Sequence, residues 1–108
     1  MGSFLQNAVV DTAASGNVTV VAGVTGKRIA VYGYTIVNGA TTAQTVQFKS
    51  GTTVLSGAMS LSQAAVPLVV QAGPSSGPLF VTVATGDALI ITTSAATQVS
   101  GHVCYQYV

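Results

Sequence analysis

The single histidine and the single cysteine of this chain lie two residues apart, at His102 and Cys104. Residues two apart on a strand share one face, so both side chains would lie together on a predicted C-terminal strand. A Cys–His nucleophile pair also needs a group that orients the imidazole, and two ligands are too few for a structural metal site. We therefore interpret Cys104 as a packed thiol and His102 as a packing or interface residue. A ring of symmetry-related His102 side chains around an oligomer axis is the alternative.

The only carboxylate side chains belong to Asp11 and Asp87. A general acid–base pair would need the two groups to converge. Each of them lies in a predicted turn, where aspartate is common because its side chain bonds to nearby backbone groups. This inventory predicts a protein that is not an enzyme and that uses no cofactor, metal or small-molecule substrate.

Charged residues make up 5% of the chain, against about 25% in an average domain. With a net charge of +1, a lone monomer would lack the repulsion that keeps proteins apart in solution. We therefore predict that an assembly buries much of the surface. A monomer with a surface of hydroxyl and amide side chains is the competing interpretation.

Three cations, Lys27, Arg28 and Lys49, are too few for the basic patch of a nucleic-acid-binding protein. No apolar run reaches the ~18 residues of a membrane span, and the N-terminal residues lack the positive region of a signal peptide. One cysteine excludes an intrachain disulfide. We expect neither nucleic-acid nor membrane binding, and synthesis and assembly in the cytoplasm.

The longest predicted strand, Lys27–Val37, is rich in β-branched and aromatic residues. Strict alternation would give it two faces without a polar row. One face would carry Ile29, Val31, Gly33, Thr35 and Val37, and the other Ala30, Tyr32, Tyr34 and Ile36. Because a strand with one wet face alternates apolar and polar residues, we expect both faces of this strand to be covered.

About eight short strands separated by turn signals predict an all-β fold, a single-domain antiparallel β-sandwich resembling a jelly roll. They include Leu68–Gln71 and the alternating run Thr45–Lys49, with Val46 and Phe48 on one face. We expect the sandwich domain to span residues 13–108. Residues 1–12 would form an N-terminal segment, either an edge strand or an arm. Phe4 and Leu5 make that segment apolar, so we expect it to be covered by the body, a neighbouring subunit or a partner.

Four tyrosines form two pairs with a spacing of two, Tyr32 with Tyr34 and Tyr105 with Tyr107. Tyrosine is enriched at interfaces because its ring is apolar and its hydroxyl is polar. Core packing explains the same pattern equally well. Together with Phe4 and Leu5, these four residues are our candidates for an oligomer or partner interface.

Four runs of the sequence resemble a group of small β-rich proteins from tailed bacteriophages: GKRIAVYGYTIV, VQFKSGTTVLSG, PLFVTVATGDAL and VSGHVCYQYV. The similarity covers about residues 18–108. The resemblance implies a decoration or cement protein, which binds the major capsid protein on the outer capsid surface as a homotrimer and stabilises the shell. Its location would then be the virion. The alternative is a receptor- or glycan-binding head of a phage fibre, which should show a shaft connection that this sequence lacks.

Overall fold

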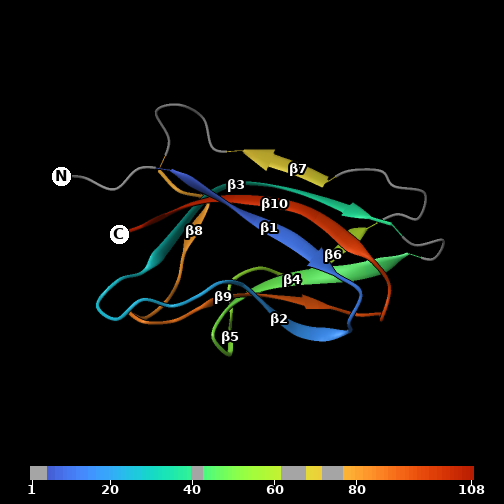
Figure 1. The fold of residues 1–108 in the computed structure, drawn as a ribbon, viewed down its shortest axis with the longest axis horizontal. Coiled ribbons are helices and arrows are strands. Elements are labelled where there is room, and N and C mark those ends of the chain that lie inside the picture. The colour runs from blue at the N-terminus through green and yellow to red at the C-terminus, as the bar shows by residue number, and fades with distance from the viewer. Residues whose placement is uncertain (1–4, 40–42, 62–67, 72–76) are drawn as a thin grey trace.

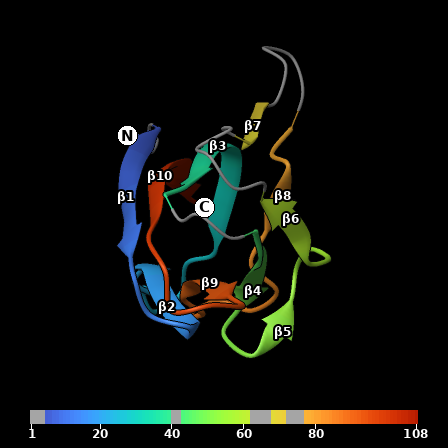
Figure 2. The ribbon, with the colours of Figure 1, turned by 90° about the vertical axis from the view of Figure 1, so that its right-hand side faces the viewer.

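The computed structural model describes residues 5–39, 43–61, 68–71 and 77–108, which form two packed antiparallel β-sheets (Figures 1 and 2). Sheet A contains, in spatial order, β1 (Gln6–Thr12), β10 (Val99–Tyr107), β3 (Ile29–Asn38) and β7 (Leu68–Gln71), with β8 (Phe80–Val81) also on β3. Sheet B contains β2 (Gly16–Val21), β9 (Leu89–Thr93), β4 (Gln44–Ser50) and β5 (Thr53–Val54), with β6 (Met59–Leu61) also on β4.

The strand pairing is nested, from the two ends of the chain inward. The first strand pairs with the last, β2 pairs with β9, β3 with β7 and β8, and β4 with β5 and β6. This is the order of a jelly roll, in which a long antiparallel ribbon folds over into two sheets. The predicted fold class is therefore confirmed. In the part of the chain that the structure describes, ten strands fill eight positions, because two positions are each occupied by two short strands in succession.

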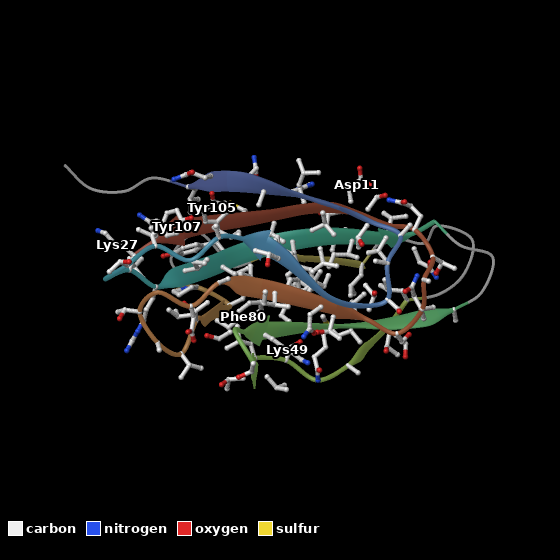
Figure 3. The ribbon with its side chains drawn as sticks, turned by 60° about the horizontal axis from the view of Figure 1, so that its bottom comes forward. Asp11, Lys27, Lys49, Phe80, Tyr105 and Tyr107 are labelled. Atoms are coloured by element: carbon white, nitrogen blue, oxygen red, sulfur yellow. The ribbon has the colours of Figure 1, made fainter. Side chains whose placement is uncertain are left out.

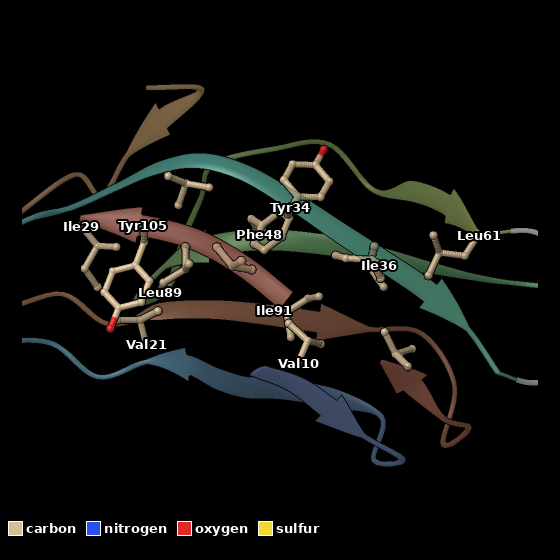
Figure 4. Close-up of a cluster of buried hydrophobic side chains, with 14 residues drawn as sticks. Val10, Val21, Ile29, Tyr34, Ile36, Phe48, Leu61, Leu89, Ile91 and Tyr105 are labelled. Carbon is tan, nitrogen blue, oxygen red and sulfur yellow. The ribbon is translucent and has the colours of Figure 1, made fainter. Parts of the chain in front are cut away.

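The core lies between the sheets and is built by strict alternation on strands such as β4. Val46 and Phe48 point inward and are fully buried, while Thr45, Gln47 and Lys49 are half-buried on the other side, as the sequence predicts. The Phe48 ring packs between Tyr34 and Phe80, with ring centroids 4.9 and 5.3 Å away. Figure 4 shows the buried core, including Tyr34 and Phe48, to which both sheets contribute.

A β-bulge changes the two predicted faces of the central strand. In the register of β3 with β10, Val31 lies opposite Tyr105 and Gly33 lies opposite Cys104, so Tyr32 has no partner. The extra residue reverses the alternation. Ile29 and Val31 before the bulge and Tyr34 and Ile36 after it therefore all point into the core. The prediction of two separate apolar faces was wrong, because it assumed an uninterrupted strand.

The N-terminal segment contributes an edge strand. Residues 6–12 pair with β10 over their whole length, and Val10 is 3% exposed in the core. Of the two interpretations of the segment, edge strand or arm, the first describes residues 6–12. Phe4 lies outside the described residues.

Buried polar side chains close both ends of the sandwich. At one end, Gln44 Nε2 donates to Asn38 Oδ1 at 3.0 Å and to Thr97 Oγ1 at 2.8 Å. At the other end, Ser50 Oγ donates to Asp87 Oδ2 at 2.6 Å and accepts a bond from the backbone N–H of Val83 at 2.8 Å. Because a buried polar group without a partner is costly, these bonds fix the loops at both ends to the sheets.

Candidate interaction surfaces

One cross-strand row of side chains crosses the outer face of sheet A, the face turned away from sheet B. Val9 lies opposite His102, His102 opposite Thr35, and Thr35 opposite Val69. Val9 is 76% exposed and Val69 is 55% exposed. Val9 and Val69 are the two most exposed valines of the described residues, and they lie at opposite edges of one sheet face. We call this line the Val9–Val69 row.

The outer face of sheet B differs, because its rows are mainly hydroxyl, amide and ammonium groups. Asn17, Thr92 and Gln47 lie opposite one another, and the Thr92 hydroxyl donates to Asn17 Oδ1 at 2.6 Å. Ile90, which is half-buried, and Val54 at the edge are the apolar members of the neighbouring row. The row Asn17–Thr92–Gln47 suits water, whereas the outer face of sheet A exposes Val9 and Val69 at its two edges.

The structure separates the four predicted interface tyrosines. Tyr34 and Tyr105 are 7% and 9% exposed and belong to the core, so packing within the domain accounts for both rings. Tyr107 packs edge-on against Tyr105 with centroids 5.5 Å apart, and its hydroxyl donates to the backbone oxygen of Ala22 at 2.9 Å. Tyr32, at the bulge, is half-buried outside the core cluster. It is therefore the one tyrosine of this set that lies on the side of the Val9–Val69 row.

Burial raises the pKa of the Tyr34 hydroxyl, which contacts Met59 Sδ at 3.2 Å. Burial and then the neighbouring Tyr105 raise the pKa of Tyr107. A tyrosine whose pKa rises on folding contributes stability that is complete below the ordinary pKa of about 10 and is lost as pH rises through the folded-state value. We therefore expect the free energy of unfolding to fall in strongly alkaline solution.

Tyr34→Phe should reduce this alkaline loss while changing stability little at neutral pH, because the hydroxyl gives up only a weak sulfur acceptor. Urea denaturation at about pH 8 and about pH 11 measures the effect, and Tyr34→Phe with Tyr107→Phe should reduce it further. If both variants lose stability as steeply as the native protein, burial of these hydroxyls does not cause the alkaline loss.

Leu5 precedes β1 and is 53% exposed, so the described residues of the domain do not cover it. Of the predicted interface residues Phe4 and Leu5, the structure describes Leu5. Val9 was absent from the predicted interface residues, although the sequence contains a signal for it. Because Val9 and Val10 are adjacent on one strand, only one of them can point into the core.

His102 and Cys104 share the outer face of sheet A, as their spacing predicts. His102 is exposed and Cys104 is half-buried, so the thiol is less deeply packed than expected. Their neighbours across the sheet are Val9 and Asn7 on β1 and Thr35 and Gly33 on β3. Within the described residues, no group of three or more His, Cys, Asp or Glu side chains lies close enough to hold a metal ion.

The two carboxylates lie at different places and do not form an acid–base pair. Asp11 Oδ1 accepts a bond from Gln98 Nε2 at 2.5 Å on the edge of sheet A. Asp87 bonds to Ser50 at the opposite end of the sandwich, where Lys27 also lies (Figure 3). Lys27 and Arg28 are exposed in the loop that precedes β3 rather than on the strand itself. Asp87 follows a turn as predicted, but the prediction of a turn at Asp11 was wrong, because this residue lies within β1. Each Asp bonds to a side chain far away in sequence rather than to nearby backbone.

None of the described residues belongs to a helix long and apolar enough to cross a membrane.

No model of a known protein family matches the chain, and no curated protein matches it. Among solved structures, the chain is similar to a protein of Bacillus endospore appendages, described as a novel family of disulfide-linked pili. The two share 17% sequence identity over 98% of this chain and 86% of the other, with a TM-score of 0.49. Similarity at this level assigns neither a family nor a function to the chain.

Proposed function

We propose that this chain is a non-enzymatic structural protein of a virus particle, which binds the outer surface of the capsid as a homotrimer and stabilises the shell. Its partner is the major capsid protein, and its place is the virion after assembly in the host cytoplasm. The resemblance of four sequence runs to phage decoration proteins supports the location on a virus particle and the trimeric state. The jelly roll is compatible with the role, since viral capsid domains use this fold, as do lectins and cupins.

The observation that carries the proposal is the difference between the two outer faces. Sheet A exposes Val9 and Val69 at the two ends of one row that also holds His102 and Thr35. The row Asn17–Thr92–Gln47 on sheet B is polar throughout, and the exposed valine of that sheet is Val54 at its edge. An antiparallel sheet tolerates one wet face, and exposed apolar side chains at both edges of the other face favour contact with protein. We infer that the bound protein turns sheet A toward the capsid or its neighbours and sheet B toward solvent.

Few charges are available for attachment, so the contact should be mainly apolar. The chain has three cationic residues, Lys27, Arg28 and Lys49, and two acidic residues, Asp11 and Asp87, which gives a net charge of +1. Salt weakens exposed ion pairs but has little effect on apolar burial. Deleting residues 1–10 would be a poor test of attachment, because it removes five of the seven residues of β1 and takes Val10 from the core.

Val69→Lys should weaken binding to particles of the virus that encodes the chain by about tenfold, since it removes about 1.5 kcal/mol of apolar burial. Gln47→Lys adds the same charge to the outer face of sheet B and should leave binding unchanged. Occupancy is measured by sedimenting particles with bound protein at about 0.1 and about 1 M NaCl, with counting by quantitative mass spectrometry. The proposal predicts numbers in multiples of three and no release by salt.

Two results would overturn the proposal. One is the absence of the native protein from these particles under all conditions tested. The other is release of the native protein by salt alone, together with a larger effect of Gln47→Lys than of Val69→Lys. That result would place an electrostatic contact on sheet B.

A further inference from the structure

The free edge of β1 lacks the usual protection of an edge strand. A sheet edge presents unpaired N–H and C=O groups, and proteins protect such edges with Lys, Pro, bulges or very short strands. β1 is seven residues long, contains neither Lys nor Pro, and pairs with β10 without a register shift. Its one charged residue, Asp11, lies next to its C-terminal end. Its partner among the described residues is β10, which leaves the other side of β1 open in Figures 1 and 2.

The sequence of β1 is complementary to a reversed copy of itself. A two-fold axis normal to a sheet keeps every side chain on its own face, and the midpoint of Gln6–Thr12 is Val9. Antiparallel pairing about Val9 would therefore use all seven residues. It places Val9 against Val9 of the second copy on the outer face, so that the most exposed of the large apolar side chains in the described residues becomes covered.

The position of Asp11, the charged residue of β1, also agrees with this register. Asp11 would lie opposite Asn7 of the second copy, where a carboxylate meets an amide that can donate. Moving the centre to Ala8 would instead place Asp11 against Leu5, and moving it to Val10 would place Asp11 against Val9 and pair fewer residues of β1. Asp11 already accepts one bond, from Gln98 at 2.5 Å, and a carboxylate has further acceptor sites.

We propose that β1 pairs antiparallel with β1 of a second copy of this chain, about a two-fold axis at Val9. The pairing joins two copies of sheet A into one continuous sheet, on which two Val9–Val69 rows meet end to end. It does not depend on the proposed function. If trimers do cover a capsid, such two-fold contacts between neighbouring trimers would connect them into a net over the shell.

Cysteine cross-linking tests the register directly, in protein that also carries Cys104→Ser. Directly opposed residues of an antiparallel pair have Cα atoms about 4.5–5.5 Å apart, within the range of a disulfide. Val9→Cys should therefore give a covalent dimer on oxidation, seen on a denaturing gel whatever the larger assembly. Asn7→Cys and Asp11→Cys should each stay monomeric alone, because their own copies lie about 13 Å apart. Mixed together, these two variants should cross-link.

Val9→Lys gives an independent test in solution without cysteine chemistry. Two ammonium groups at the two-fold axis repel each other, so the dissociation constant of this contact should rise about tenfold or more. Because Val9 is 76% exposed, the fold should tolerate the lysine. Val54→Lys, at the edge of sheet B and 53% exposed, is the matched control and should leave the constant unchanged. Sedimentation velocity over a concentration series measures both.

Two outcomes would overturn the pairing: Val9→Cys that cross-links no better than Val54→Cys, or Val9→Lys that associates as strongly as Val54→Lys. A cross-link at Ala8→Cys in place of Val9→Cys would reject the register centred on Val9. Failure of the proposed function is distinguishable from failure of this pairing. Protein that cross-links at Val9 but never binds capsids would overturn only the proposed function. Protein that binds capsids but does not cross-link would overturn only the β1 pairing.

Discussion

Gly101→Ala should lower the free energy of unfolding by about 3–5 kcal/mol, one of the largest effects of a single methyl group in this chain. Gly101 lies in the middle of β10, opposite Ile36 on β3. Its φ is +149°, a backbone conformation that residues with a side chain rarely adopt. A Cβ at this position would overlap the backbone carbonyl of Thr35, which cannot move without disturbing the pairing of the central strands.

Gly57→Ala is the matched control for this substitution. Gly57 is exposed, has no positive φ, and a Cβ built there meets nothing within 4 Å. Its replacement should change stability by less than about 0.5 kcal/mol. Urea denaturation followed by circular dichroism gives both values. Equal stabilities for the two variants would contradict the close approach of β10 and β3 at Gly101.

Phe48→Ala should cost about 3–5 kcal/mol, because it removes the largest fully buried side chain. The ring links the two sheets: Phe48 belongs to sheet B, and its aromatic neighbours Tyr34 and Phe80 belong to sheet A. Truncation would therefore leave a cavity between the layers and also remove two aromatic contacts.

Val54→Ala serves as the control for Phe48→Ala, since Val54 is 53% exposed at the edge of sheet B. We expect its effect to stay within about 0.5 kcal/mol. The same denaturation experiment compares the two. A Phe48→Ala variant as stable as Val54→Ala would show that the sheets do not pack through this ring.

Local patterns predicted the strands well where the alternation was regular. Thr45–Lys49 lies within β4, and Leu68–Gln71 coincides with β7. The prediction of faces failed on Lys27–Val37 because the bulge at Tyr32 depends on β10, a strand far away in sequence. Alternation within one segment contains no information on the register of its partner.

The candidate surface was harder to predict than the fold. Tyrosine is a residue type enriched at interfaces, yet Tyr34 and Tyr105 both lie in the core. The Val9–Val69 row exists only because the jelly roll brings β1 beside β10 and β7 beside β3. Residues separated by most of the chain therefore become neighbours, and only the topology of the sheet reveals them.

Cryo-electron microscopy of particles that carry the protein tests the central claim most directly. The claim is that assembly buries the outer face of sheet A and leaves the outer face of sheet B in water. The reconstruction should show jelly-roll density on the outer capsid surface, with Val9 and Val69 covered by protein and Asn17, Gln47 and Thr92 facing solvent. Particles in which sheet B lies against the capsid while Val9 and Val69 face solvent would contradict it.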